Sequence, residues 1–344
     1  MLGRCGLPAL GAAPYAPRMR RRLPILLIPL LAGCLLAPDA EGPGGPPSGM
    51  AARVGAIVDS LAAIHSRFMH NDEGCSYALD WMAARLAAQG TPARRDSFRF
   101  FRTRWIDTAN LEVVFPGRSR PGSEVVVGAH WDAVAYPESF YDSTARAPGA
   151  DDNASGVAAL IELARLLKDR PTEHTVRVVL LAAEEIGHQG AYHLRDRFIE
   201  SPGADSLVCF VCVDMLGYEA DAVRDAGIVC NAMSRDMAES ALPAIREALT
   251  PAVPLPGGPP PAPVLAVDTH LRDITNSPNS DHLMFWYSDL PAVELQEGPD
   301  DTCPAANTAA DTTGNVDPEF LADGTRALLA LVLHLAVPAG NPWD

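Results

Sequence analysis

Short apolar runs alternate with longer amphipathic segments along most of the chain. Several runs, such as "VRVVLLAA" at 176–183, are continuous and rich in Val and Leu, which is typical of strands covered by helices on both faces. The runs predict strands at Ser97–Phe101, Asn110–Val114, Glu124–Ala129, Thr175–Ala183, Leu207–Val213, Gly227–Asn231 and Ala292–Leu295. Helical spacing predicts two helices within 51–90 and others at Ala154–Leu167, Gly190–Phe198, Arg235–Leu249, Asp281–Tyr287 and Pro318–Leu335.

This alternation of strands and helices predicts an α/β fold. We expect a doubly wound, mostly parallel mixed sheet flanked by helices, in a single domain that spans 51–344. The Pro-rich stretch "TPAVPLPGGPPPAPVL" cannot form regular structure, so it predicts an insertion near 250–265.

The start of the chain has a different composition. A basic cluster, Arg18 to Arg22, precedes an apolar run from Leu23 to Leu31 and then small residues before Cys34, which is the layout of a secretory signal. The run is too short to span a bilayer as a helix. The ending "LAGC" resembles the bacterial lipobox, so residues 1–33 are expected to be a leader and signal peptide, and Cys34 to carry a lipid. The alternative is an ordinary cleaved signal with a chance cysteine.

Residues 34–50 are rich in Pro and Gly and predict a tether between the anchor and the folded domain. The protein is therefore expected to be exported, as a lipoprotein of the bacterial cell envelope or in secreted form, with membrane contact only through Cys34. The pairing of the other cysteines stays open. In "LVCFVCV", strand alternation sends Cys209 and Cys212 to opposite faces, so we expect both to pack in the core.

The net charge of −16 argues against a nucleic-acid partner, because a phosphate backbone attracts basic surfaces. We expect a monomer that acts on peptide substrates.

Acidic residues and histidines follow several of the predicted strands. In open α/β sheets the ligand crevice lies beyond the carboxyl ends of the strands, so these side chains are expected to meet at one edge. They are His130, Asp132, Asp151, Asp152, Glu184, Glu185, Asp214 and His282.

Each of these residues alone has an ordinary structural explanation. Asp152 alone is most simply a helix N-cap or a first-turn acid, and Asp214 alone a turn residue. Together, buried carboxylates would cost several kcal/mol each without a cation. Histidines with carboxylates are the donor set for zinc. Three ligand carboxylates and one hydroxide together balance the charge of two Zn²⁺ ions. A single Zn²⁺ would leave the site negative, so the sequence favours two Zn²⁺ per chain.

Five motifs, in the order "GAHWDAV", "GADDNASG", "AAEEIGHQGA", "VDMLGY" and "SDHLMFW", resemble the co-catalytic dizinc aminopeptidase family. This family, of the bacterial leucyl aminopeptidase type, also holds glutamate carboxypeptidase II, glutaminyl cyclase and the transferrin-receptor ectodomain. The resemblance covers roughly 110–295 and implies the zinc-exopeptidase, phosphorylase/hydrolase-like fold in a single catalytic domain.

The resemblance also implies a ligand set. His130 and Asp214 would bind one zinc, Glu185 and His282 the other, and Asp152 would bridge the two ions.

Two further residues acquire catalytic roles by the same resemblance. Glu184 would be the general base, and Asp132 would orient the His130 imidazole. A cis peptide is implied between Asp152 and Asn153.

The implied function is that of a zinc-dependent exopeptidase, an aminopeptidase that removes N-terminal residues from peptides. Three alternatives stay open: a carboxypeptidase, which would need a basic residue such as Arg272 for the substrate carboxylate, a glutaminyl-cyclase-like enzyme, and a non-catalytic receptor-like binding domain. The sequence leaves side-chain specificity open.

Overall fold

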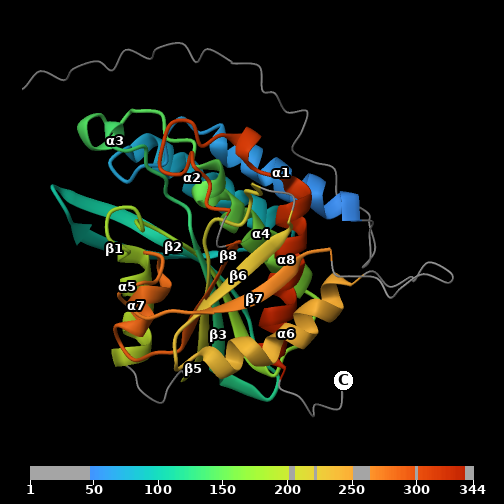
Figure 1. The fold of residues 1–344 in the computed structure, drawn as a ribbon. Helices are drawn as coiled ribbons and strands as arrows, with labels where there is room; N and C mark the ends of the chain where they lie inside the picture. Colours follow the sequence, from blue (N-terminus) through green and yellow to red (C-terminus); the bar gives the residue numbers. More distant parts are fainter. Residues whose placement is uncertain (1–46, 201–205, 221–222, 251–263, 299–300, 338–344) are drawn as a thin grey trace, which may run out of the picture. The chain divides into compact units, whose positions relative to one another are not determined.

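Within the residues that the structure describes, eight strands form one sheet in the order β1-β2-β4-β3-β5-β8-β6-β7 (Figure 1). The structure, a computed structural model, describes residues 47–200, 206–220, 223–250, 264–298 and 301–337. The strands are β1 (Arg94–Phe101), β2 (Trp105–Phe115), β3 (Arg120–His130), β4 (His174–Leu181), β5 (Ser206–Val213), β6 (Asp225–Cys230), β7 (Ala266–Leu271) and β8 (Ala292–Glu297). The predictions for the leader, for the tether up to residue 46 and for most of the Pro-rich insertion lie outside the described residues.

The centre of the sheet is parallel and its flanks are mixed. Strand β3 pairs in parallel with β4 and β5, and β5 with β8. The hairpin β1–β2 joins β4 in antiparallel fashion, and β6 is antiparallel to β8 but parallel to β7. The predicted doubly wound, mostly parallel mixed sheet is thereby confirmed.

Helices cover both faces of the sheet (Figure 1). The longer helices α1, α4 and α8 pack with one another over one face, and α5 and α7 pack against the other, where Leu194 and Phe285 meet Val126 and Phe210 of the strands. The helices are α1 (Pro47–Ala62), α2 (Asp72–Ala88), α3 (Glu138–Tyr141), α4 (Gly156–Leu167), α5 (Gln189–Glu200), α6 (Arg235–Leu249), α7 (His282–Trp286) and α8 (Pro318–Ala336), with a π turn at Ala150–Ser155 (η1) and a 3-10 turn at Thr313–Asn315 (η2).

The two cysteines of β5 separate as strand alternation predicts. Cys209 packs in the core under α1, α4 and α8, and Cys212 packs in the core under α5 and α7. Every cysteine of the described residues is a buried free thiol: Cys75, Cys209, Cys212, Cys230 and Cys303.

Three differences from the predicted elements concern short or partly exposed segments. Helix α1 begins at Pro47, inside the segment predicted to be a tether. Strand β7 and the four-residue helix α3 were not predicted, since "AVDTHL" in β7 carries polar side chains on a half-exposed strand at the end of the sheet.

No helix among the described residues is both long and apolar enough to cross a bilayer.

Candidate active site

The carboxyl ends of β3, β4 and β5 lie side by side in the sheet and deliver the predicted residues to one cavity. His130 is the last residue of β3, Glu184 and Glu185 follow β4, and Asp214 follows β5. The cavity has a volume of about 370 Å³. The described residues that line it are His130, Tyr136, Asp152, Glu184, Glu185, Gly187, His188, Asp214, Met215, Pro278, Asn279, Ser280, Glu294, Gln296 and Asn307.

Four of the five predicted metal ligands lie together: His130, Asp152, Glu185 and Asp214. The Nε2 atom of His130 lies 3.2 Å from Asp152 Oδ1 and 3.2 Å from Asp214 Oδ1. One ligand atom from each of His130, Asp152 and Glu185 lies within 4.8 Å of the others. Asp152 therefore lies close to Glu185 and to His130, which in turn contacts Asp214, and a bridging carboxylate needs such neighbours.

The Asp152 carboxylate is held in place through the backbone around it. Buried Asp311 accepts hydrogen bonds from the backbone N–H groups of Asp151 and Asp152, each at 3.0 Å. Asn153 donates from Nδ2 to the Val213 carbonyl oxygen at 2.9 Å, which ties the loop to the end of β5. The peptide between Asp152 and Asn153 is cis, as the resemblance implied.

Asp132 fixes the glutamate pair more directly than it fixes His130. Its carboxylate accepts the backbone N–H groups of Glu184 at 3.0 Å and of Glu185 at 3.2 Å. His130 Nδ1 lies 3.2 Å from the Asp132 backbone carbonyl oxygen and 3.7 Å from its carboxylate. The imidazole is therefore oriented by the Asp132 backbone, while the side chain positions the loop that carries the two glutamates.

The electrostatics of the cavity suit divalent cations. Burial, followed by the nearby charges of Asp152 and Glu184, raises the pKa of Glu185 well above its ordinary value. Burial also raises the pKa of Asp152. For Asp214 burial acts in the same direction, but the His130 ring outweighs it and lowers the pKa. Glu185 Oε1 is buried without a hydrogen-bond partner. The donor set and this orphaned oxygen fit zinc, whose charge would offset the clustered carboxylates.

Glu184 lies in a chain of ionisable groups with His188 and Asp281. Its Oε1 atom is 3.1 Å from His188 Nδ1, which is 3.4 Å from Asp281 Oδ1. Burial, opposed by His188, raises the pKa of Glu184 to about 7. Burial disfavours the charged form of His188, but Asp281 and Glu184 outweigh it and raise the pKa of His188 to about 11. Glu184 is thus a carboxyl group poised for proton transfer near neutral pH.

His282 does not belong to the group of ligand atoms of His130, Asp152 and Glu185. It is the first residue of α7 and is fully buried, with Nδ1 3.3 Å from Glu294 Oε2 and Nε2 2.8 Å from Ser277 Oγ. Its ring packs edge-on against Trp286, and burial lowers its pKa to about 3. Its ligand atoms group with those of Cys212 and Glu294. The predicted pairing of His282 with Glu185 therefore stays a prediction.

The polar residues of the cavity that the sequence did not single out include Asn307 and His188. Asn307 donates from Nδ2 to Asp152 Oδ2 at 2.9 Å, and His188 accompanies Glu184. The sequence could have indicated His188, because it stands four residues after Glu184 in "AAEEIGHQGA". The loop around Asn307, "PAANTAADT", has no apolar periodicity and carried no signal.

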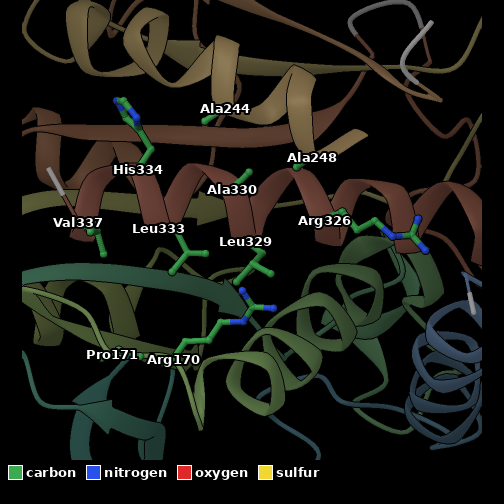
Figure 2. A pocket seen from close by; sticks show the side chains of 10 residues that line it. All are labelled: Arg170, Pro171, Ala244, Ala248, Arg326, Leu329, Ala330, Leu333, His334 and Val337. Atoms are coloured by element: carbon green, nitrogen blue, oxygen red, sulfur yellow. The ribbon is translucent and has the colours of Figure 1, made fainter. Parts of the chain in front are cut away.

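Two other cavities lack the chemistry of this one. A larger one, of about 730 Å³, lies between α6 and α8 beside Arg170 and is lined mostly by apolar residues, with no carboxylate (Figure 2). Arg272 lines a cavity next to the candidate site and not the site itself.

The model of peptidase family M28 matches residues 110–332. The chain belongs to peptidase family M28. This match confirms the predicted resemblance. The matched range includes every described residue that lines the cavity.

Relatives and solved structures agree with this family. The aminopeptidase YwaD of Bacillus subtilis is 38% identical over 84 residues, which are 24% of this chain and 18% of that protein. The LapA aminopeptidase of Legionella pneumophila has the same fold, with a TM-score of 0.65 at 20% identity over 84% of this chain and 73% of that one. A glutaminyl cyclase of Bacteroides thetaiotaomicron has a TM-score of 0.61 at 18% identity, over 82% and 97%. The first curated relatives are matched over less than two thirds of their own length.

Proposed function

We propose that this M28 chain is a zinc-dependent aminopeptidase that releases N-terminal residues from peptides. The observation that carries the proposal is the convergence of His130, Asp152, Glu185 and Asp214 in a cavity that also holds Glu184. Aminopeptidases among its relatives and structural neighbours support the reaction class.

The residues of the cavity divide into metal ligands and a proton carrier. His130 and Asp214 would hold one zinc, Glu185 would hold part of a second, and Asp152 would lie between them. Bound zinc supplies a Lewis acid that polarises the scissile carbonyl group and acidifies water.

Glu184 performs the proton transfers. Its carboxylate accepts a proton from the attacking water and delivers it to the nitrogen of the leaving amine, so that the C–N bond breaks as the new C–O bond is retained. His188 holds the carboxylate by ion pairing and is itself paired with Asp281. Asp132 holds the backbone that carries Glu184.

The charge of the cavity favours a free N-terminus over a C-terminal carboxylate. Five carboxyl groups line it, and none of its described lining residues is an arginine or lysine. Apart from the predicted ligand His130, the cationic side chain among the described lining residues is that of His188, which is already paired with Glu184 and Asp281. A substrate carboxylate would therefore have no free basic side chain to bind it, whereas the carboxylates of the wall can bind an ammonium group. This favours an aminopeptidase over a carboxypeptidase.

A substrate panel tests the proposal. Aminoacyl-p-nitroanilides with a free amine are compared with their N-acetylated forms and with peptides that are blocked at the N-terminus and free at the C-terminus. We expect hydrolysis of the free-amine compounds and loss of at least about a hundredfold in rate on acetylation. Preferred cleavage of the blocked peptides would contradict the proposal and indicate a carboxypeptidase.

The same panel addresses the two remaining alternatives. A glutaminyl substrate that releases ammonia with ring closure and no nitroaniline would indicate a cyclase. Zinc-free protein without activity on any substrate would indicate a binding domain. Export and lipid attachment at Cys34 remain part of the proposal, as does a monomeric state.

A further inference from the structure

The ion position beside Glu185 differs in its donors from the position beside Asp214. His130 Nε2 lies 3.2 Å from carboxylate oxygens of both Asp152 and Asp214, so that position has an imidazole. Among the described residues of the cavity, the other imidazole is that of His188, whose Nδ1 faces Glu184 and Asp281. His188 is not part of the group of ligand atoms around Asp152. His282 is packed against Glu294 and Trp286.

Asn307 occupies the place where another donor is needed. Its Nδ2 donates to Asp152 Oδ2, the oxygen of the bridging carboxylate that does not face His130. Its Oδ1 is buried and has no hydrogen-bond partner, and the same is true of Glu185 Oε1. Two orphaned oxygens therefore belong to side chains beside Asp152, which is costly unless a cation or its water satisfies them.

The backbone holds Asn307 firmly toward the cavity. Its φ of 59° lies in the left-handed region, which asparagine tolerates better than most residues. Its carbonyl oxygen accepts the Tyr136 N–H at 2.8 Å, and Asp311, four residues later, binds the Asp151 and Asp152 backbone. The loop that carries Asn307 is thus fastened to the loop that carries the bridging acid.

We propose that Asn307 is a ligand of the second ion through Oδ1 and that the two metal positions are unequal. The position of His130 and Asp214 holds Zn²⁺ tightly, because imidazole suits zinc. The position of Glu185 and Asn307 has only oxygen donors, so it binds a divalent ion more weakly, exchanges it, and accepts a harder ion such as Mn²⁺. This inference rests on the proposed zinc site and deepens it.

Metal content tests the inference without an activity assay. The purified full chain is loaded with zinc, dialysed against a chelator of moderate strength, and analysed for zinc per chain. We expect one equivalent in the wild type and two in Asn307→His, because the new imidazole strengthens the second position. Mn²⁺ added to the one-zinc form should bind with one equivalent by electron paramagnetic resonance. The affinity of the chain for this Mn²⁺ should fall by about tenfold or more in Asn307→Gly.

The variants are chosen to keep the loop intact. Glycine and histidine both accept a positive φ, so neither change forces the backbone, and thermal unfolding verifies each fold. His282→Gln is the matched control, and it should leave the zinc and manganese equivalents unchanged.

Three results would overturn the inference. The first is two equally tight zinc equivalents in the wild type and in Asn307→Gly. The second is loss of one zinc or manganese equivalent in folded His282→Gln, which would restore His282 as the ligand. The third is a chain that retains no zinc at either position, which would overturn the proposed function together with the inference, whereas the first two leave the function intact.

Discussion

At the scale of single residues, Glu184 and Glu185 are neighbours in sequence with different surroundings. Both are linked to Asp132 through their backbone N–H groups. Glu184 faces the cationic His188, whereas Glu185 faces Asp152 and keeps an unpartnered oxygen. Two adjacent carboxylates can therefore serve as a proton carrier and a metal ligand.

Replacing Glu184 separates these roles. Glu184→Gln keeps the shape of the side chain but cannot accept a proton, so we expect kcat to fall by about 10²–10⁴-fold with unchanged zinc content. Glu185→Ala should instead lose zinc. Glu239→Gln, on the exposed face of α6, is the control and should match the wild type in both measurements. Equal activity and equal zinc in all three variants would contradict the assignment.

The pH dependence of turnover follows from the same carboxyl group. The pKa of Glu184 is raised to about 7, mainly by burial. Only the deprotonated form accepts a proton, so kcat should fall as the pH drops through this pKa. Bound cations stabilise the carboxylate, which places the acidic limb at or below pH 7. A kcat that stays constant down to pH 4, with zinc retained, would remove Glu184 from the proton transfer.

At the scale of elements, the continuous apolar runs predicted β3, β4 and β5 and the edge where their ends meet. Buried parallel strands leave little ambiguity, because few other elements need Val and Leu at every position. Strand β7 was missed, since half-exposed residues such as Asp268 and His270 carry no such pattern. Its pairing with β6 depends on a neighbour and not on local propensity.

One polar residue within β4 is expected to carry much of the stability of the sheet. Arg177 is buried and binds Glu124 of β3 through two contacts of 2.7 Å and Glu112 of β2 at 2.9 Å. Arg177→Leu would leave the buried Glu124 without this cation, and the buried Glu112 with only Arg94 and Arg197 beside it. We expect the free energy of unfolding to fall by about 3–5 kcal/mol, measured by urea denaturation.

A cross-strand pair at the surface provides the control for Arg177. Arg99 in β1 contacts Asp107 in β2, and both side chains are exposed. Arg99→Leu should leave the unfolding midpoint nearly unchanged, because water screens this pair. Equal destabilisation by the two substitutions would show that the buried network has no special role.

At the scale of the whole molecule, the sequence predicted the edge of the sheet that forms the site but not every residue in it. Strand ends placed His130, Glu185 and Asp214. Asn307 comes from the loop between β8 and α8, and its position depends on contacts 155 residues apart in sequence, which local patterns do not encode. His282, predicted from its motif, is buried at the start of α7 and is not among the described residues that line the cavity, so its role as a ligand stays a prediction.

The predicted signal peptide and lipid attachment at Cys34 can be tested with the whole protein in a cell. If Cys34 carries a lipid, the wild-type chain expressed in a bacterium should incorporate labelled palmitate and fractionate with membranes. Cys34→Ser should do neither. A wild-type chain that is exported without label would contradict the lipoprotein prediction and favour an ordinary cleaved signal.

The most direct test of the central claim is the metal dependence of aminoacyl-nitroanilide hydrolysis by the purified chain. The rate is measured before treatment with a strong chelator, after treatment, and after zinc is returned, with Glu184→Gln carried through the same steps. We expect the wild type to lose its activity with its metal and to regain it with zinc, while Glu184→Gln regains metal but not activity. Hydrolysis that persists in metal-free protein, or that Glu184→Gln recovers in full, would contradict the claim.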